Sequence, residues 1–164
     1  MTDPKFYTTY KAVFDAIKTA LAYVPAVPAH DEVPEVPARG VELLKTVAVG
    51  EQFTLGGLPK ATVNPAPGPV ESESMDGLLC VYVRGNITVV VRDYAPKDWF
   101  VDVILPMGAV VDALLADRTL GGVAADCRLT GFAPGEIKFK DAAGEDRLLF
   151  GGDIPFEAKI LYEP

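Results

Sequence analysis

The hydrophobic residues near the N-terminus follow the period of a helix. Apolar side chains recur every three or four positions, with charged residues between them, which predicts an amphipathic helix over about residues 4–23. Asp3 and Pro4 suit its start, because aspartate can accept hydrogen bonds from free N–H groups and proline fits a first turn. Pro25 ends the pattern.

A second helical pattern runs from Pro96 to Leu115 and contains Pro106 in its interior. Proline removes a backbone N–H and clashes with the preceding turn of a helix. We therefore expect two helical pieces, near residues 96–105 and 107–117.

The stretch LLADRTLGGV, residues 114–123, joins this region to an alternating strand over residues 124–130. Gly121 and Gly122 suit such a junction, because glycine accepts the positive φ that a helix end followed by a reversal requires. We expect a turn here that places Leu120 in the core.

Further apolar runs predict about seven strands and hence an α+β fold: an antiparallel or mixed sheet with both helical regions packed on one face. Arg84-Gly85-Asn86 predicts a hairpin turn between two central strands, 78–83 and 87–94. Ala133-Pro134-Gly135 predicts another turn, and Gly151-Gly152 predicts a bulge or bend. The other strands are expected at residues 41–49, 60–63, 136–140, 147–150 and 154–162. Buried side chains are expected at Phe14, Ile17, Val81, Val89, Leu114, Cys127 and Phe156.

Two proline-rich segments contribute no core residues to a single domain over residues 1–164. Residues 25–39 carry four prolines, which favours an extended segment. Residues 64–77 carry three prolines and a Glu-Ser repeat, which predicts an exposed, flexible loop. We expect both segments to be mobile in the isolated subunit and ordered in an assembly.

The formal net charge of −8 and the absence of a Lys/Arg cluster disfavour specific nucleic-acid binding. No apolar run approaches the length of a membrane span, so we expect no membrane association. The N-terminus has no basic region followed by an apolar one, so we do not expect secretion.

Residues with catalytic or metal-binding chemistry are few and scattered. His30 is the only histidine, and we expect it to be an exposed loop residue. Cys80 and Cys127 lie in predicted strands as reduced core thiols, unless those strands are adjacent and a disulfide forms. Three aspartates recur on the second helical region and are expected on a solvated face: Asp98, Asp102 and Asp112.

No phosphate-binding, zinc-binding or nucleophile motif occurs in the sequence. We therefore expect no catalytic, cofactor-binding or metal-binding residues and no cofactor, so that the protein is not an enzyme. Catalysis by carboxylates alone stays open as an alternative.

Three motifs resemble the tail terminator proteins of long-tailed phages, also called tail completion or head–tail joining proteins. They are LLADRTLGGV (114–123), a strand ending in LTGF (129–132), and FGGDIPFEAKI (150–160). Members of that family share an N-terminal helix, a β-hairpin, a second helix ending in an ADxTLGG-type turn, and a closing hairpin. The proline-rich segments 25–39 and 64–77 have no counterpart in them.

The resemblance implies a structural virion protein without enzymatic activity. It would be one subunit of a ring, expected to be hexameric, that terminates the tail tube and joins it to the head connector while DNA passes through the lumen. Its partners would be copies of itself, the major tail tube protein and the head–tail connector or stopper. Its place would be the virion tail or neck, and the host cytoplasm during assembly. The alternatives are another neck or tail-tube component, or an α+β module that binds a small ligand or a peptide.

Overall fold

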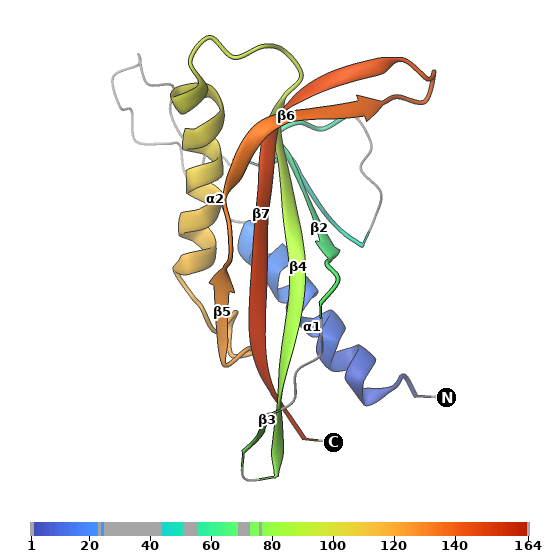
Figure 1. The fold of residues 1–164 in the computed structure, drawn as a ribbon, viewed down its shortest axis with the longest axis vertical. Coiled ribbons are helices and arrows are strands. Elements are labelled where there is room, and N and C mark those ends of the chain that lie inside the picture. The colour runs from blue at the N-terminus through green and yellow to red at the C-terminus, as the bar shows by residue number, and fades with distance from the viewer. Residues whose placement is uncertain are drawn as a thin grey trace.

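The computed structural model describes residues 2–22, 24, 44–50, 56–68, 73–75 and 77–163. These residues form two α-helices, a π-helical turn and seven strands (Figure 1). In chain order they are α1 (Lys5–Leu21), β1 (Thr46–Val49), β2 (Lys60–Pro65), β3 (Glu73–Met75), β4 (Leu78–Arg92), η1 (Phe100–Ile104), α2 (Leu105–Leu115), β5 (Asp126–Leu129), β6 (Ala133–Lys140) and β7 (Asp146–Tyr162).

The seven strands form one mixed sheet in the order β1-β2-β4-β7-β5. In addition, β3 pairs with β4 and β6 pairs with β7. Among the strands of the described residues, only β1 and β2 pair in parallel. The two longest strands, β4 and β7, lie side by side through the middle of the molecule (Figure 1). The predicted α+β class is confirmed.

Both helices pack on the same face of this sheet. Val13, Phe14 and Ile17 of α1 and Val110 and Leu114 of α2 belong to one buried cluster with the inward-facing residues of β4 and β7. All seven side chains that the sequence predicted to be buried are between 0% and 5% exposed: Phe14, Ile17, Val81, Val89, Leu114, Cys127 and Phe156. The hydrophobic period therefore located the core correctly.

The predicted hairpin at Arg84-Gly85-Asn86 is wrong, because residues 78–92 form one continuous strand. Gly85 faces the helices and pairs with Phe156 on β7. A Cβ at Gly85 would overlap the ring of Phe156 and lie 2.9 Å from the ring of Phe14. This glycine makes room for two core aromatic rings, which stack edge to face with centroids 5.7 Å apart.

The second glycine pair also lies inside a continuous strand. Gly151 and Gly152 are residues of β7, and the only register shift falls on its neighbour β4, between Val90 and Arg92. A Cβ at Gly151 would overlap the backbone of Val89 on one side of the strand. The expected bulge is therefore present next to Gly151, but it lies on β4 and not on β7.

Other strand boundaries differ from expectation. β6 begins at Ala133, so the turn predicted at Ala133-Pro134-Gly135 is wrong. Pro134 is tolerated in this strand because β6 pairs with β7 on one side only, and no described strand on the other side needs a hydrogen bond from its missing N–H. Within the predicted loop 64–77, β2 continues to Pro65 and residues 73–75 form β3. Residues 69–72 and 76 of that loop and the whole of 25–39 lie outside the described residues.

The helix starts can also be compared with expectation. Pro4, not Asp3, occupies the N-cap position of α1, and no side chain caps this helix. In the second helical region, Pro106 lies in the first turn of α2, directly after η1. The predicted division into two pieces near 96–105 and 107–117 is wrong, because η1 continues directly into α2 and Pro106 fits the first turn of α2. The segment before it is a π-helical turn in which Leu105 donates its N–H to the carbonyl of Phe100.

The packing role of Gly85 gives a direct test. Gly85→Ala should lower the free energy of unfolding by about 1–3 kcal/mol, because the new methyl group overpacks the Phe14–Phe156 contact. Gly108→Ala is the matched control: Gly108 lies in α2 with open space around it, so alanine should stabilise by about 0.5–1 kcal/mol. Urea unfolding of both variants measures the difference, and equal effects would contradict this assignment.

Candidate functional site

The turn between α2 and β5 is built around one aspartate. The carboxylate of Asp117 accepts hydrogen bonds from the Thr119 N–H (3.0 Å), the Thr119 hydroxyl (2.6 Å) and the Gly121 N–H (2.8 Å). The Thr119 carbonyl in turn accepts from the N–H groups of Gly122 and Ala124. The N–H groups of four turn residues that follow α2 are therefore satisfied within the turn: Thr119, Gly121, Gly122 and Ala124.

Three consecutive residues of this turn have positive φ: Leu120 at 52°, Gly121 at 69° and Gly122 at 88°. The prediction for the glycines and for the burial of Leu120, which is 5% exposed, is confirmed. The sequence did not predict positive φ at Leu120, which is costly for a residue with a Cβ. Burial of its side chain between the helices and the sheet offsets that cost.

The turn is also fastened to the edge of the sheet. The Cys127 N–H donates to the Arg118 carbonyl at 2.7 Å, and the Arg118 guanidinium lies 2.6 Å from the Asp126 carboxylate. The direction of α2 relative to β5 is thus fixed by hydrogen bonds at both ends of the turn.

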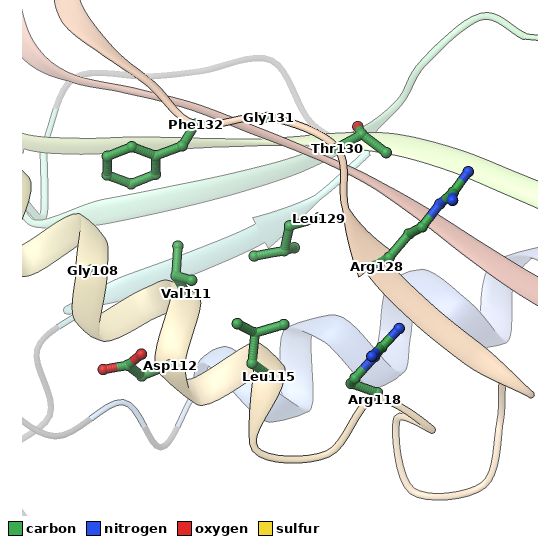
Figure 2. Close-up of a pocket in the computed structure, with 10 residues that line it drawn as sticks. All are labelled: Gly108, Val111, Asp112, Leu115, Arg118, Arg128, Leu129, Thr130, Gly131 and Phe132. Carbon is green, nitrogen blue, oxygen red and sulfur yellow. The ribbon is translucent and has the colours of Figure 1, made fainter.

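A groove of about 770 Å³ lies between α2 and the β5 edge. Figure 2 shows Val111 and Leu115 of α2 and Leu129 of β5 pointing toward one another across it. Arg118 and Arg128 lie at one end of the groove. It is apolar along its floor and charged at that end. We call it the α2–β5 groove.

The sheet face opposite the helices is polar. On this face Glu157, which is 7% exposed, accepts hydrogen bonds from Arg84 on β4 (2.9 Å) and Arg128 on β5 (2.6 Å). Farther along, Asp153 accepts from Asn86 and Thr88. These contacts tie β4, β7 and β5 together.

The β6–β7 hairpin extends beyond the rest of the sheet as an arm (Figure 1). Pairing between β4 and β7 stops at Phe150, so residues 146–149 pair with β6 alone. At the tip, the Asp141 carboxylate accepts from the N–H groups of Ala143 and Glu145 and lies 3.1 Å from Arg147. The arm is therefore a preorganised projection with an exposed Leu148.

The predicted core thiols lie apart. Cys80 on β4 pairs with Leu161, and Cys127 on β5 pairs with Ala158, on opposite sides of β7. Both are buried and unbonded, so the alternative of a disulfide is excluded. Burial raises the pKa of the Cys127 thiol to about 11, which makes it a poor nucleophile.

The three aspartates of the second helical region do not converge. Asp98 accepts from the Phe100 N–H, and Asp102 accepts from the Lys97 N–H and lies 3.2 Å from Arg92. The N–H of Asp98 is the main cause of the lowered pKa of Asp102. Asp112 is an exposed residue of α2 and lines the α2–β5 groove. His30 lies outside the described residues, among which no three metal-ligating side chains cluster.

The sequence reasoning missed the groove and the polar sheet face. A signal for the polar face was present, since Tyr82, Arg84, Asn86 and Thr88 alternate with apolar residues through the supposed turn. Read as one strand, this alternation would have placed the polar residues on one face. The groove had no such signal, because it depends on the distance between α2 and β5.

A scan against protein-family models gives no match, and a search of curated proteins finds no relative of this chain. No helix in the described parts of the chain is long and apolar enough to cross a membrane. The surfaces that the fold presents therefore carry the functional argument.

Substitution at the turn tests its backbone requirement. Gly121→Val and Gly122→Val should each cost about 1–3 kcal/mol of unfolding free energy, because both glycines have positive φ and no neighbour crowds them. Gly135→Val is the control, since Gly135 also has open space but lies in strand β6 without positive φ. A loss of stability at Gly135 equal to that at Gly121 would contradict backbone strain as the cause.

The Asp117 carboxylate gives a pH-dependent test. Its pKa is lowered, mainly by the hydrogen bond from the Thr119 hydroxyl and then by the Gly121 N–H. A lowered folded-state pKa contributes stability above the unfolded value of about 3.8, which is lost as pH falls through the folded value. The Tm difference between wild type and Asp117→Asn should therefore shrink below about pH 4. Asp112→Asn, at an exposed position of α2, is the control. A Tm difference between wild type and Asp117→Asn that stays constant with pH would contradict the prediction.

Proposed function

We propose that this protein is a structural subunit of a phage tail, forming a ring that terminates the tail tube and joins it to the head connector. The proposal has two sources: the resemblance of residues 114–160 to tail terminator proteins, and the surfaces that this fold presents. The observation that carries it is the Asp117 turn, which fixes the angle between helix and sheet in each subunit.

A fixed angle is what a closed ring requires. Each subunit of a ring uses two different surfaces, and an error in their relative direction is repeated at every interface. The turn has three residues of positive φ, a buried Leu120 and hydrogen bonds to β5. Such a junction resists bending more than a flexible loop would.

The surfaces of the subunit also support assembly. β1 lies at one edge of the sheet and β5 at the other. Open strand edges are sites where another chain can pair. The β6–β7 arm projects from the body and exposes Leu148, and Phe100 at the start of η1 is 74% exposed. These features favour protein–protein contacts over a buried small-molecule site.

The α2–β5 groove favours a second candidate function, a module that binds a small ligand or a peptide. Its apolar floor and charged end are typical of recognition sites. Light scattering distinguishes the two, because a ring has several times the 17.5 kDa mass of the subunit and a binding module runs as a monomer or dimer.

The ring proposal predicts that the turn matters more for assembly than for folding. Gly122→Val should reduce the yield of rings, seen by electron microscopy and light scattering, more than Ile17→Val does. Ile17→Val is the control in the core: it costs about 0.5–1.5 kcal/mol, which overlaps the lower part of the range expected for Gly122→Val, and it leaves the turn intact. The wild-type protein should form rings either in isolation or when it is mixed with tail tubes.

Two results would contradict the proposal. One is a particle of subunit mass at every concentration, with no binding to tail tubes. The other is a gene neighbourhood without tail genes, since the gene of a tail terminator is expected just before that of the major tail tube protein.

A further inference from the structure

We propose that the β6–β7 arm docks on α2 of a second copy of this chain, with Leu148 in a hollow beside α2 and Lys138 next to Asp112 of that copy. The inference rests on the proposed function, because it names the contact by which copies associate. It follows from two complementary surfaces that each subunit presents on different sides.

The hollow lies on the outer side of the second helical region, over η1 and the first turns of α2, and has a volume of about 400 Å³. Nothing lies within 4 Å of the position that a Cβ would take at Gly108, which leaves room there. Phe100 is 74% exposed and Leu105 is 37% exposed. Large apolar side chains that are exposed around a depression are typical of protein–protein contacts. The described residues that line the hollow are apolar except for one aspartate: Phe100, Ile104, Leu105, Gly108, Ala109 and Asp112.

The carboxylate of Asp112 is available to a partner. Its residue is exposed, and within the described part of the chain its side chain has no ion-pair or hydrogen-bond partner. Figure 2 shows this carboxylate pointing away from Leu129 and from Arg118, although Asp112 also lines the α2–β5 groove. A carboxylate at the rim of an apolar hollow complements a partner that carries a cation beside an apolar side chain.

The β6–β7 arm carries such a pair of side chains. Lys138 on β6 and Leu148 on β7 are direct partners in the antiparallel register. Residues directly opposite each other in such a pair of strands place their side chains next to each other on the same face. Leu148 is 40% exposed, and Lys138 is exposed as well. The arm therefore presents an apolar side chain with a cation at its side.

Three other charged residues share this face of the arm: Glu136, Lys140 and Asp146. Lys140 lies directly opposite Asp146, so these two charges offset each other within the arm. Glu136 lies two residues from Lys138 toward the base of the arm, and no carboxylate of the described residues forms an ion pair with Lys138. Lys138 is therefore the cation that the arm offers to a partner.

The direction of the arm assigns the contact to a second copy. In the view of Figure 1, α2 lies at the left of the molecule, whereas the β6–β7 arm extends to the right from the top of the sheet. The arm of one subunit therefore points away from its own α2 and toward a neighbour. Because the contact uses a different surface on each copy, it is a head-to-tail contact, which is the kind that closes into a ring.

Exchange of the two charges tests the contact on the full chain. Lys138→Glu and Asp112→Lys should each raise the concentration of half-maximal assembly about tenfold, measured by light scattering. The double variant Lys138→Glu/Asp112→Lys should return to within about threefold of wild type, because opposite charges meet again. The matched control is Lys18→Glu/Asp112→Lys, which has the same net charge of −8 but changes an exposed lysine of α1. This control should assemble no better than Asp112→Lys alone.

Cross-linking identifies the two surfaces directly. Leu148→Cys places a thiol on the arm, and Phe100→Cys places one at the hollow, both at exposed positions. The native Cys80 and Cys127 are buried and should not react. A mixture of the two variants treated with a short bismaleimide should give a covalent dimer. Each variant treated alone should give none, because the arm meets α2 of the neighbour and not a second arm.

Three outcomes would overturn the inference: equal assembly of the two double variants, covalent dimers of either cysteine variant alone, or no covalent dimer from the mixture. The failure of this contact and that of the proposed function are distinguishable. Rings that form without cross-linking in the mixture would remove this contact and leave the proposed function standing. Cross-linked open chains that never close and do not bind tail tubes would support the contact and remove the tail function.

Discussion

The antiparallel ladder between β4 and β7 is the constraint on which the rest of the structure depends. It runs from the Leu79–Tyr162 pair to the Arg92–Phe150 pair, and every other sheet strand except β1 pairs with one of these two. At its centre Gly85 lets the Phe156 ring lie across the sheet beneath Phe14 of α1. The absence of a side chain at Gly85 thus lets α1 pack closely on the sheet while β4 continues as one strand.

The helices, the core and the Asp117 turn could be predicted from the sequence because each depends on neighbours a few residues away. The errors occurred where a glycine serves a contact distant in sequence. Gly85 resembled a turn residue between two apolar runs, but its partner Phe156 lies 71 residues later in the chain. Gly151 likewise accommodates the backbone of Val89. The hydrophobic period alone cannot distinguish a glycine in a turn from a glycine whose missing side chain makes room for a residue of another element.

The two faces of the sheet differ in chemistry. The helix-covered face holds the hydrophobic core, whereas the open face holds Glu157 between Arg84 and Arg128. The buried Glu157 carboxylate joins three strands by pairing with Arg84, whose side chain is 25% exposed, and with Arg128, whose side chain is 63% exposed. Such pairs contribute little net stability. Their effect here is to hold Arg128 beside the end of the α2–β5 groove.

The Asp117 turn connects these parts. By hydrogen bonding to Cys127 it closes the first half of the β5 edge, and by ending α2 where it does it sets the width of the groove in front of Leu129. The strain at Leu120 is retained because the buried side chain and the hydrogen bonds around Asp117 over-determine the turn. The feature that joins α2 to the sheet is therefore the same one that shapes the α2–β5 groove.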